Sequence, residues 1–149
     1  MNETQEITLI EKHELVGVAA ELFGDGYRFV QVSCATLESA YEFTYSFDKN
    51  YRLKNFRFSV TQDEEVPSIS VIFPNAFLYE NEIHDLFGIP IRNITVDYRG
   101  TLYRTAIRVP FSIAGTRARL APKQNEESRE RADAPIAPHA VNTPEEHKE

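Results

Sequence analysis

Acidic and imidazole side chains are dense in the stretch YENEIHDLFG, residues 79–88, and such a cluster could do chemistry. Glu80 and His84 are four residues apart, the spacing at which two side chains of one helix can share a metal ion. Glu82 and Asp85 could serve as a general acid and a general base if they opened on a substrate pocket. Either arrangement would make this stretch a metal-binding or catalytic site.

The rest of the sequence completes neither kind of site. A metal site needs about three or four ligands, and the one Cys and four His of the chain supply no further ligand at a suitable spacing. No nucleophile or Gly-rich phosphate loop accompanies the acid pair. Cys34 lies in an alternating apolar run, which is typical of a buried structural thiol. We therefore expect no catalytic residue, metal or cofactor in this chain, and interpret Glu80 and His84 as a solvated ion pair.

A helix is expected to carry the cluster. Pro74-Asn75 offers an N-cap and Gly88-Ile89-Pro90 offers a stop. At 100° per residue, the apolar side chains between these signals share one arc, which should pack on a sheet. The residues of this arc are Ala76, Tyr79, Ile83, Leu86 and Phe87.

The opposite flank of this helix carries two like charges one turn apart, Glu82 and Asp85. Their repulsion, and the position of Asp85 near the negative end of the helix dipole, are mildly unfavourable. Two interpretations remain open: an ordinary solvated face, or a face that meets a cationic partner from this chain or another. Four arginines follow the helix directly and could supply such charges: Arg92, Arg99, Arg104 and Arg108.

The elements before this helix predict an α+β fold. Apolar residues at helical spacing between positions 15 and 23, followed by Gly24 and Gly26, predict a first helix. Period-two patterns and polar connections predict strands at residues 27–37, 41–47, 53–60 and 68–73. The short connections favour an antiparallel four-stranded sheet with the N-terminal helix and the second helix packed on it.

Composition limits the remaining possibilities. The net charge of −7 argues against nucleic-acid binding, and no apolar run approaches the roughly 20 residues of a membrane span. All 10 Phe and 7 Tyr lie at or before Phe111, whereas four of the eight prolines follow residue 121. We therefore predict an α+β domain over residues 1–113 and an extended or disordered tail over residues 114–149.

The stretch NAFLYENEIHDLFGIPI resembles the signature helix of the 30 kDa-type subunit family of complex I, which typically reads Trp/Tyr-Glu-Arg-Glu-x-x-Asp-Leu-Phe-Gly-Ile. Asn81 stands where that family usually has arginine. The preceding stretch GYRFVQVSCAT and the aromatic strand resemble the same family, so the resemblance covers roughly residues 8 to 92. The matching signature positions are Tyr79, Glu80, Glu82, Asp85, Leu86, Phe87, Gly88 and Ile89.

The continuation narrows the resemblance. Complex I members continue into a segment like Gly-His-Pro-Leu-Arg-Lys-Asp-Phe-Pro, whereas this chain runs ITVDYRGTLYRTAIRVPFS. It is more similar to the small, cofactor-free subunit of membrane-bound, energy-converting nickel–iron (NiFe) hydrogenases of the Ech or CO-induced type. The resemblance implies a structural and assembly subunit, on the cytoplasmic side and attached to the membrane only through its partners.

The same resemblance implies partners and contact residues. The partners would be the large, nickel-bearing subunit and the iron–sulfur subunits of the peripheral arm, which would hold the NiFe centre and the clusters. The 30 kDa-type subunit of complex I itself is the first alternative, and a stand-alone ferredoxin-like binding domain is the second. The implied partner-binding residues are Tyr79, Glu80, Glu82, Asp85, Leu86, Phe87, Gly88, Arg92, Arg99, Arg104 and Arg108.

Overall fold

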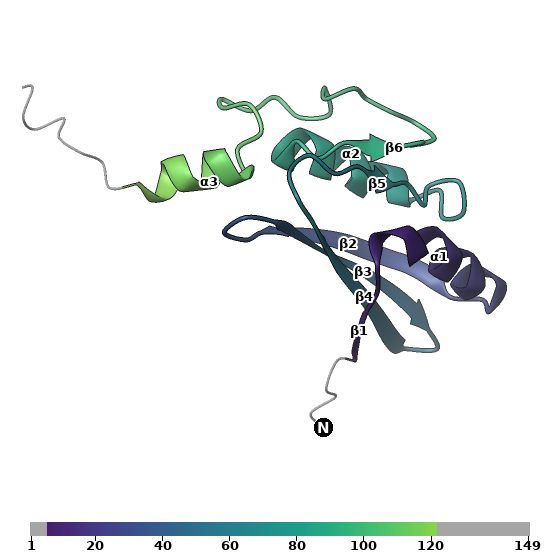
Figure 1. Ribbon diagram of the computed structural model, residues 1–149. Helices are drawn as coiled ribbons and strands as arrows, with labels where there is room; N and C mark the ends of the chain where they lie inside the picture. The colour runs from purple at the N-terminus through teal and green to yellow at the C-terminus, as the bar shows by residue number, and fades with distance from the viewer. Residues whose placement is uncertain (1–5, 122–149) are drawn as a thin grey trace, which may run out of the picture.

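The computed structural model describes residues 6–121, whose main sheet is covered on one face by two helices (Figure 1). The sheet has the strand order β1-β4-β3-β2, and α1 and α2 lie over the same face of it. The elements that build these two layers are β1 (Ile7–Leu9), η1 (Lys12–Glu14), α1 (Leu15–Gly24), β2 (Arg28–Thr36), β3 (Tyr41–Lys49), β4 (Arg52–Val60) and α2 (Ala76–Phe87). The predicted α+β class and both predicted helices are confirmed.

The sheet is mixed, so the prediction of a purely antiparallel sheet was wrong. Strands β2, β3 and β4 pair antiparallel as expected, but the fourth strand is β1, which runs parallel to β4 with Ile7 beside Asn55. The predicted strand at residues 68–73 forms turns instead. The period-two pattern of this segment did not correspond to burial, because Val71 is 76% exposed. The backbone N–H of Ile69 also donates to the Glu80 side chain of α2 and not to a neighbouring strand.

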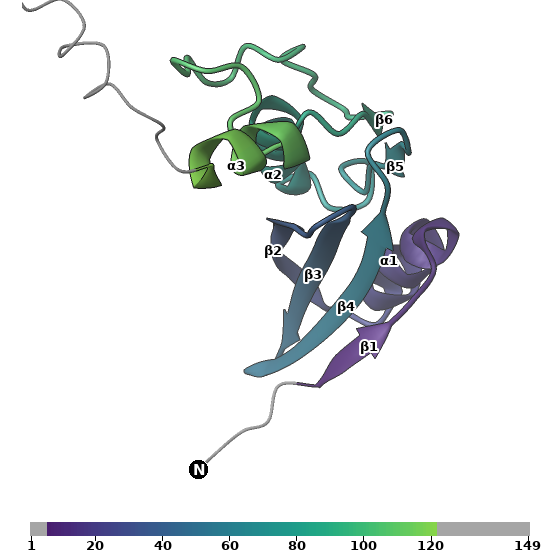
Figure 2. The same cartoon turned by 60° about the vertical axis from the view of Figure 1, so that its left-hand side comes forward.

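The core consists mainly of aromatic rings on one face of β3. The alternating residues Tyr41, Phe43, Tyr45 and Phe47 are fully buried. Phe43 stacks on Phe58 of β4, with ring centroids 5.3 Å apart and planes 2° apart. The opposite face of the sheet has no helix on it among the described elements (Figure 2). The aromatic residues that alternate along β3 therefore form its buried face.

The hairpin between β3 and β4 turns at Asn50 and Tyr51, whose φ angles are 53° and 64°. Two successive residues with positive φ suit the tight hairpin turn whose twist matches that of the strands. Asn tolerates this conformation, whereas a bulky residue does so at a cost of roughly 1–2 kcal/mol. The chain therefore reverses between Lys49, the last residue of β3, and Arg52, the first residue of β4.

Helix α2 lies between the sheet and the chain that follows it. The helix begins after Asn75 and ends at Gly88, as predicted, and Gly88 has the left-handed φ of 77°. A short parallel pair, β5 (Val66–Pro67) and β6 (Ile91–Arg92), joins the segments on either side of the helix. Residues 93–112, called the extension below, then run over the outer side of α2 (Figures 1 and 2).

The extension leads into a third helix, α3 (Ile113–Leu120), which the sequence did not predict. Ser112 caps it by accepting a hydrogen bond from Gly115 N, and Ile113 N donates to the Tyr41 hydroxyl at 3.0 Å. The domain boundary at residue 113 stays a prediction, and residues 114–120, which were expected to belong to an extended or disordered tail, are helical. Most of the predicted tail, residues 122–149, lies outside the described residues.

Replacing Phe43 by alanine should destabilise the domain by about 3–5 kcal/mol, because it removes a fully buried ring and leaves a cavity. Urea unfolding followed by circular dichroism measures this loss. Leu53→Ala, at a position that is 43% exposed, is the control and should cost less than about 1.5 kcal/mol. Equal losses for the two variants would show that the aromatic stack is not the main stabilising contact of the sheet.

Candidate functional site

Glu80 is the most deeply buried charged residue of the predicted cluster, with 0% of its surface exposed. Its Oε1 accepts a hydrogen bond from Ile69 N at 2.8 Å, and its Oε2 accepts one from the Ser68 hydroxyl at 2.6 Å. The predicted solvated ion pair with His84 is therefore wrong. Periodicity put Glu80 on a flank of the helix, but the 68–73 turns fold over that flank and bury it.

The buried carboxyl organises two segments of backbone. The Ser70 hydroxyl lies 2.6 Å from that of Ser68 and accepts a hydrogen bond from Thr95 N at 2.9 Å. Burial raises the pKa of Glu80 above its ordinary value of 4.5, although the hydrogen bonds from the serines and from Ile69 act against it. Glu80 is thus closed off from solvent, and it fixes the turns and the start of the extension relative to α2.

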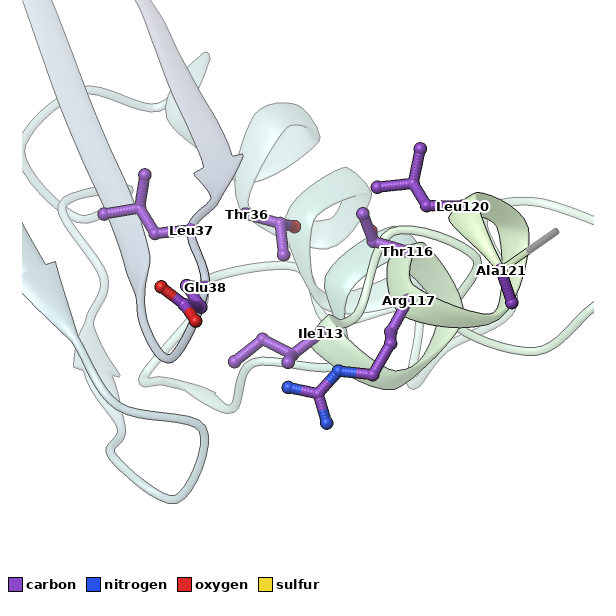
Figure 3. Close-up of a pocket in the computed structure, with 8 residues that line it drawn as sticks. All are labelled: Thr36, Leu37, Glu38, Ile113, Thr116, Arg117, Leu120 and Ala121. Atoms are coloured by element: carbon purple, nitrogen blue, oxygen red, sulfur yellow. The ribbon is translucent and has the colours of Figure 1, made fainter.

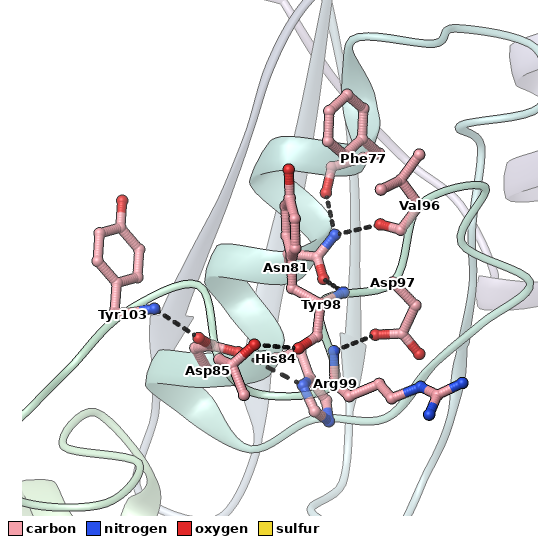
Figure 4. Close-up of polar contacts among 10 residues, drawn as sticks. Phe77, Asn81, His84, Asp85, Val96, Asp97, Tyr98, Arg99 and Tyr103 are labelled. Carbon is pink, nitrogen blue, oxygen red and sulfur yellow. Dashed lines mark hydrogen bonds and ion pairs between the residues drawn. The ribbon is translucent and has the colours of Figure 1, made fainter.

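Asn81, the next residue, holds the extension to the outer side of α2 (Figure 4). It is also fully buried. Its Nδ2 donates to Phe77 O and to Val96 O, both at 2.7 Å, and its Oδ1 accepts from Tyr98 N at 2.8 Å. One amide side chain thus satisfies two backbone carbonyls and one backbone N–H.

The acidic flank of α2 is covered by this chain's own extension. Tyr103 N donates to Asp85 Oδ2 at 2.9 Å, and the Tyr103 hydroxyl donates to Glu82 Oε2 at 3.2 Å. The nearby charge of Glu82 raises the pKa of the Tyr103 hydroxyl, and this hydrogen bond raises the pKa further but by less. The Asp85 side chain is only 3% exposed. The flank is therefore no ordinary solvated face, and its first partner lies within the chain.

The apolar arc of α2 packs less deeply than predicted. Ala76 and Ile83 are buried as expected, but the other three positions are half-buried. Tyr79 meets Phe29 edge to face at 5.7 Å between ring centroids. The ring centroid of Phe87 lies 6.2 Å from that of Tyr41 and 5.5 Å from that of Phe111. Leu86 O accepts a hydrogen bond from Phe111 N at 2.8 Å.

Gly88 combines two requirements that exclude a side chain. Its φ is in the left-handed region, and an added Cβ would come within 3.0 Å of the Val109 side chain. The extension therefore approaches the end of α2 closely at this point. The signature glycine allows both the helix to stop and the extension to return across it.

The four arginines that follow α2 are placed differently from one another. Arg92 forms an ion pair with Glu65, beside the β5–β6 pair. Arg99, Arg104 and Arg108 are exposed, and all three line a hollow of about 840 Å³ between α2, the extension and the start of α3. Within residues 6–121, no carboxylate forms an ion pair with these three guanidinium groups. The predicted cationic partner of the acidic flank is thus not these arginines.

A second hollow, of about 480 Å³, lies between the β2–β3 connection and α3 (Figure 3). Its wall is mainly apolar, with Leu37, Ile113 and Leu120 contributing, and it reaches Ala121, the last described residue.

In the described part of the chain, no group of three or more His, Cys, Asp or Glu residues could hold a metal ion. None of the helices in residues 6–121 is long and apolar enough to cross a membrane.

Sequence reasoning missed Asn81 and Tyr103, which make the central contacts of the site. Asn81 lies on the side of the helix opposite Ile83, so periodicity placed it in solvent. Its burial depends on the extension, whose path no local pattern reveals. The only available signal was the replacement of the family's usual arginine by a short amide at this position.

Comparison with known proteins finds one matching family and a solved structure with a similar fold. The family described as the respiratory-chain NADH dehydrogenase 30 kDa subunit matches residues 8–112. No curated protein matches the chain. Among solved structures, a chain of the membrane-bound sulfane sulfur reductase, an archaeal respiratory membrane complex, is similar with a TM-score of 0.65. The two chains share 12% identity over 85% of each, which is a similarity of fold.

Replacing Asn81 by alanine should release the extension, because Val96 O and Tyr98 N then lose their partner. We expect a loss of about 1–3 kcal/mol in stability and faster amide hydrogen exchange at Tyr98. Exchange measured by mass spectrometry on the full chain tests this. Gln31→Ala, at an exposed position of β2, is the control. Unchanged exchange across residues 96–98 would rule out the clamp.

Replacing Glu80 by glutamine should change how stability depends on pH. Because burial raises the pKa of Glu80 in the folded chain above 4.5, its contribution is fully present below that pH. The contribution is lost as pH rises through the folded value. The wild type should therefore lose stability relative to Glu80→Gln as pH rises from 4 towards 8 in urea titrations. Glu38→Gln removes an exposed carboxylate as control, and parallel curves for wild type and Glu80→Gln would contradict the expectation.

Proposed function

Because the chain belongs to the respiratory-chain NADH dehydrogenase 30 kDa subunit family, we propose that it is a structural docking subunit of a membrane-bound respiratory oxidoreductase complex. The observation that carries this proposal is the set of hydrogen bonds between α2, the signature helix, and the backbone of the segments that cover it. Glu80, Asn81 and Asp85 each bind backbone groups of neighbouring segments. In this proposal the signature helix presents the extension to a partner, and the chemistry takes place in other subunits.

The match confirms the resemblance to the 30 kDa-type subunit family that the sequence showed. The kind of respiratory complex to which the chain belongs is part of this proposal. We propose that the complex is an energy-converting NiFe hydrogenase. The residues after the helix support it, since residues 94–112 depart from the continuation typical of complex I. The similar fold in a sulfane sulfur reductase complex supports a setting other than NADH oxidation, because it shows this fold in a different respiratory membrane complex.

The 30 kDa-type subunit of complex I is the second candidate, and one specific observation favours it. The matching family takes its description from NADH dehydrogenase, and the match extends to residue 112, through the extension. In both candidates, partner subunits would hold the chain at the cytoplasmic face of the membrane. The hydrogenase proposal adds a large, nickel-bearing subunit and iron–sulfur subunits as its neighbours.

Isolation of the tagged full-length chain from detergent-solubilised membranes of its own host separates these candidates. For the hydrogenase, we expect a large subunit and iron–sulfur proteins to co-purify, together with nickel in about one-to-one ratio by elemental analysis. Co-purification of a nickel-free, quinone-reducing complex would select the complex I candidate. Recovery of the chain alone, under conditions that keep other membrane complexes intact, would favour a stand-alone ferredoxin-like domain and reject the proposal.

A further inference from the structure

The hollow beside the C-terminal half of α2 has an unusual rim. Arg99, Arg104 and Arg108 come from the extension, and none has an acidic partner within residues 6–121. Like charges that share one hollow repel each other, so the arrangement is most stable when an anionic group lies among them. Guanidinium groups bind carboxylates with two parallel hydrogen bonds. The rim therefore fits acidic groups.

The floor of the same hollow is closed by this chain itself. Asp85 Oδ2 is bonded to Tyr103 N, and Asp85 Oδ1 is buried at ion-pair distance, 3.6 Å, from His84 Nδ1. Gly100 of the extension lies close over both atoms, since a Cβ added to it would stand 3.9 Å from each of them. The acidic floor is therefore not open to an incoming group, and the arginines of the rim are the charged groups that an incoming segment meets.

We infer that this hollow binds an acidic segment of a partner polypeptide, whose carboxylates meet the three arginines of the rim. This inference rests on the proposed docking function and names the chemistry of the partner. A polypeptide segment with several acidic side chains can present a carboxylate to each guanidinium group, and each such pair can form two parallel hydrogen bonds.

The depth and placement of the hollow suit such a segment. Its volume of about 840 Å³ exceeds what one carboxylate group fills. It is walled on one side by the end of α2, where Gly88 lets the extension come close. The acidic flank itself is already used by Tyr103, so an incoming acidic segment would meet the three arginines first. Electrostatic attraction would thus orient the segment before it docks.

A photo-crosslinker placed in the hollow tests the inference within the assembled complex. Thr105, which lines the hollow, is replaced by p-benzoylphenylalanine in the full-length tagged chain, and the complex is irradiated before purification. We expect a crosslink to one partner peptide that contains at least two carboxylates. Arg104→Gln combined with Arg108→Gln should lower the crosslink yield at least fivefold. Arg52→Gln, in the exposed β4 start, should leave the yield unchanged.

The outcomes separate this inference from the proposed function. Co-purification of partner subunits without a crosslink, or with a crosslink that the double arginine variant does not lower, overturns the inference and leaves the docking function standing. A crosslinked peptide from residues 122–149 of this chain, or one without carboxylates, also overturns it. Absence of any co-purifying subunit rejects both. Thermal unfolding of each variant checks folding, and Arg104→Lys with Arg108→Lys, which keeps both charges, should recover part of the yield.

Discussion

The structure depends on one constraint: helix α2 is covered on both sides, so its polar side chains must be satisfied inside the protein. A surface helix leaves its polar face to water, but here the sheet covers one side and the extension the other. Glu80 and Asn81 meet the constraint by binding backbone groups of the segments that cover them. A buried donor or acceptor left alone would cost about 1–3 kcal/mol. The path of residues 68–73 and of 95–98 follows from these bonds.

Three strands of the sheet and the helices α1 and α2 could be predicted because their signals are local, whereas α3 was not predicted. Alternating aromatics on β3 and the stop at Gly88 are read within a few residues, and both are confirmed by the structure. The fourth strand could not be found this way. β1 has only three residues and pairs with β4 across more than forty positions of chain, whereas the misleading run at residues 68–73 had the right period. The Ile69 N–H of this run is bonded to Glu80, a contact that no periodicity encodes.

The candidate site shows the same division between local and distant information. The signature residues were found by resemblance, and the acidic flank was recognised as unfavourable in isolation. Its stabilising contact is supplied by Tyr103, through a backbone N–H and a hydroxyl, although the arginines were the more obvious candidates. Charge pairing is easy to propose from sequence, but a backbone donor becomes available only once the chain path is known. Arg99, Arg104 and Arg108 are exposed, so the extension is held to α2 by backbone contacts while these three arginines form no ion pair within residues 6–121.

The two buried polar residues of α2 differ in when they can be satisfied as the chain leaves the ribosome. Synthesis delivers the N-terminal residues of a chain first. The partners of Glu80, Ser68 and Ile69, precede it in the chain, so its bonds can form as soon as α2 does. Two partners of Asn81 lie 15 and 17 residues downstream. A nascent chain that ends before residue 96 therefore contains the partners of Glu80 on residues 68 and 69 but none of the partners of Asn81 on the extension.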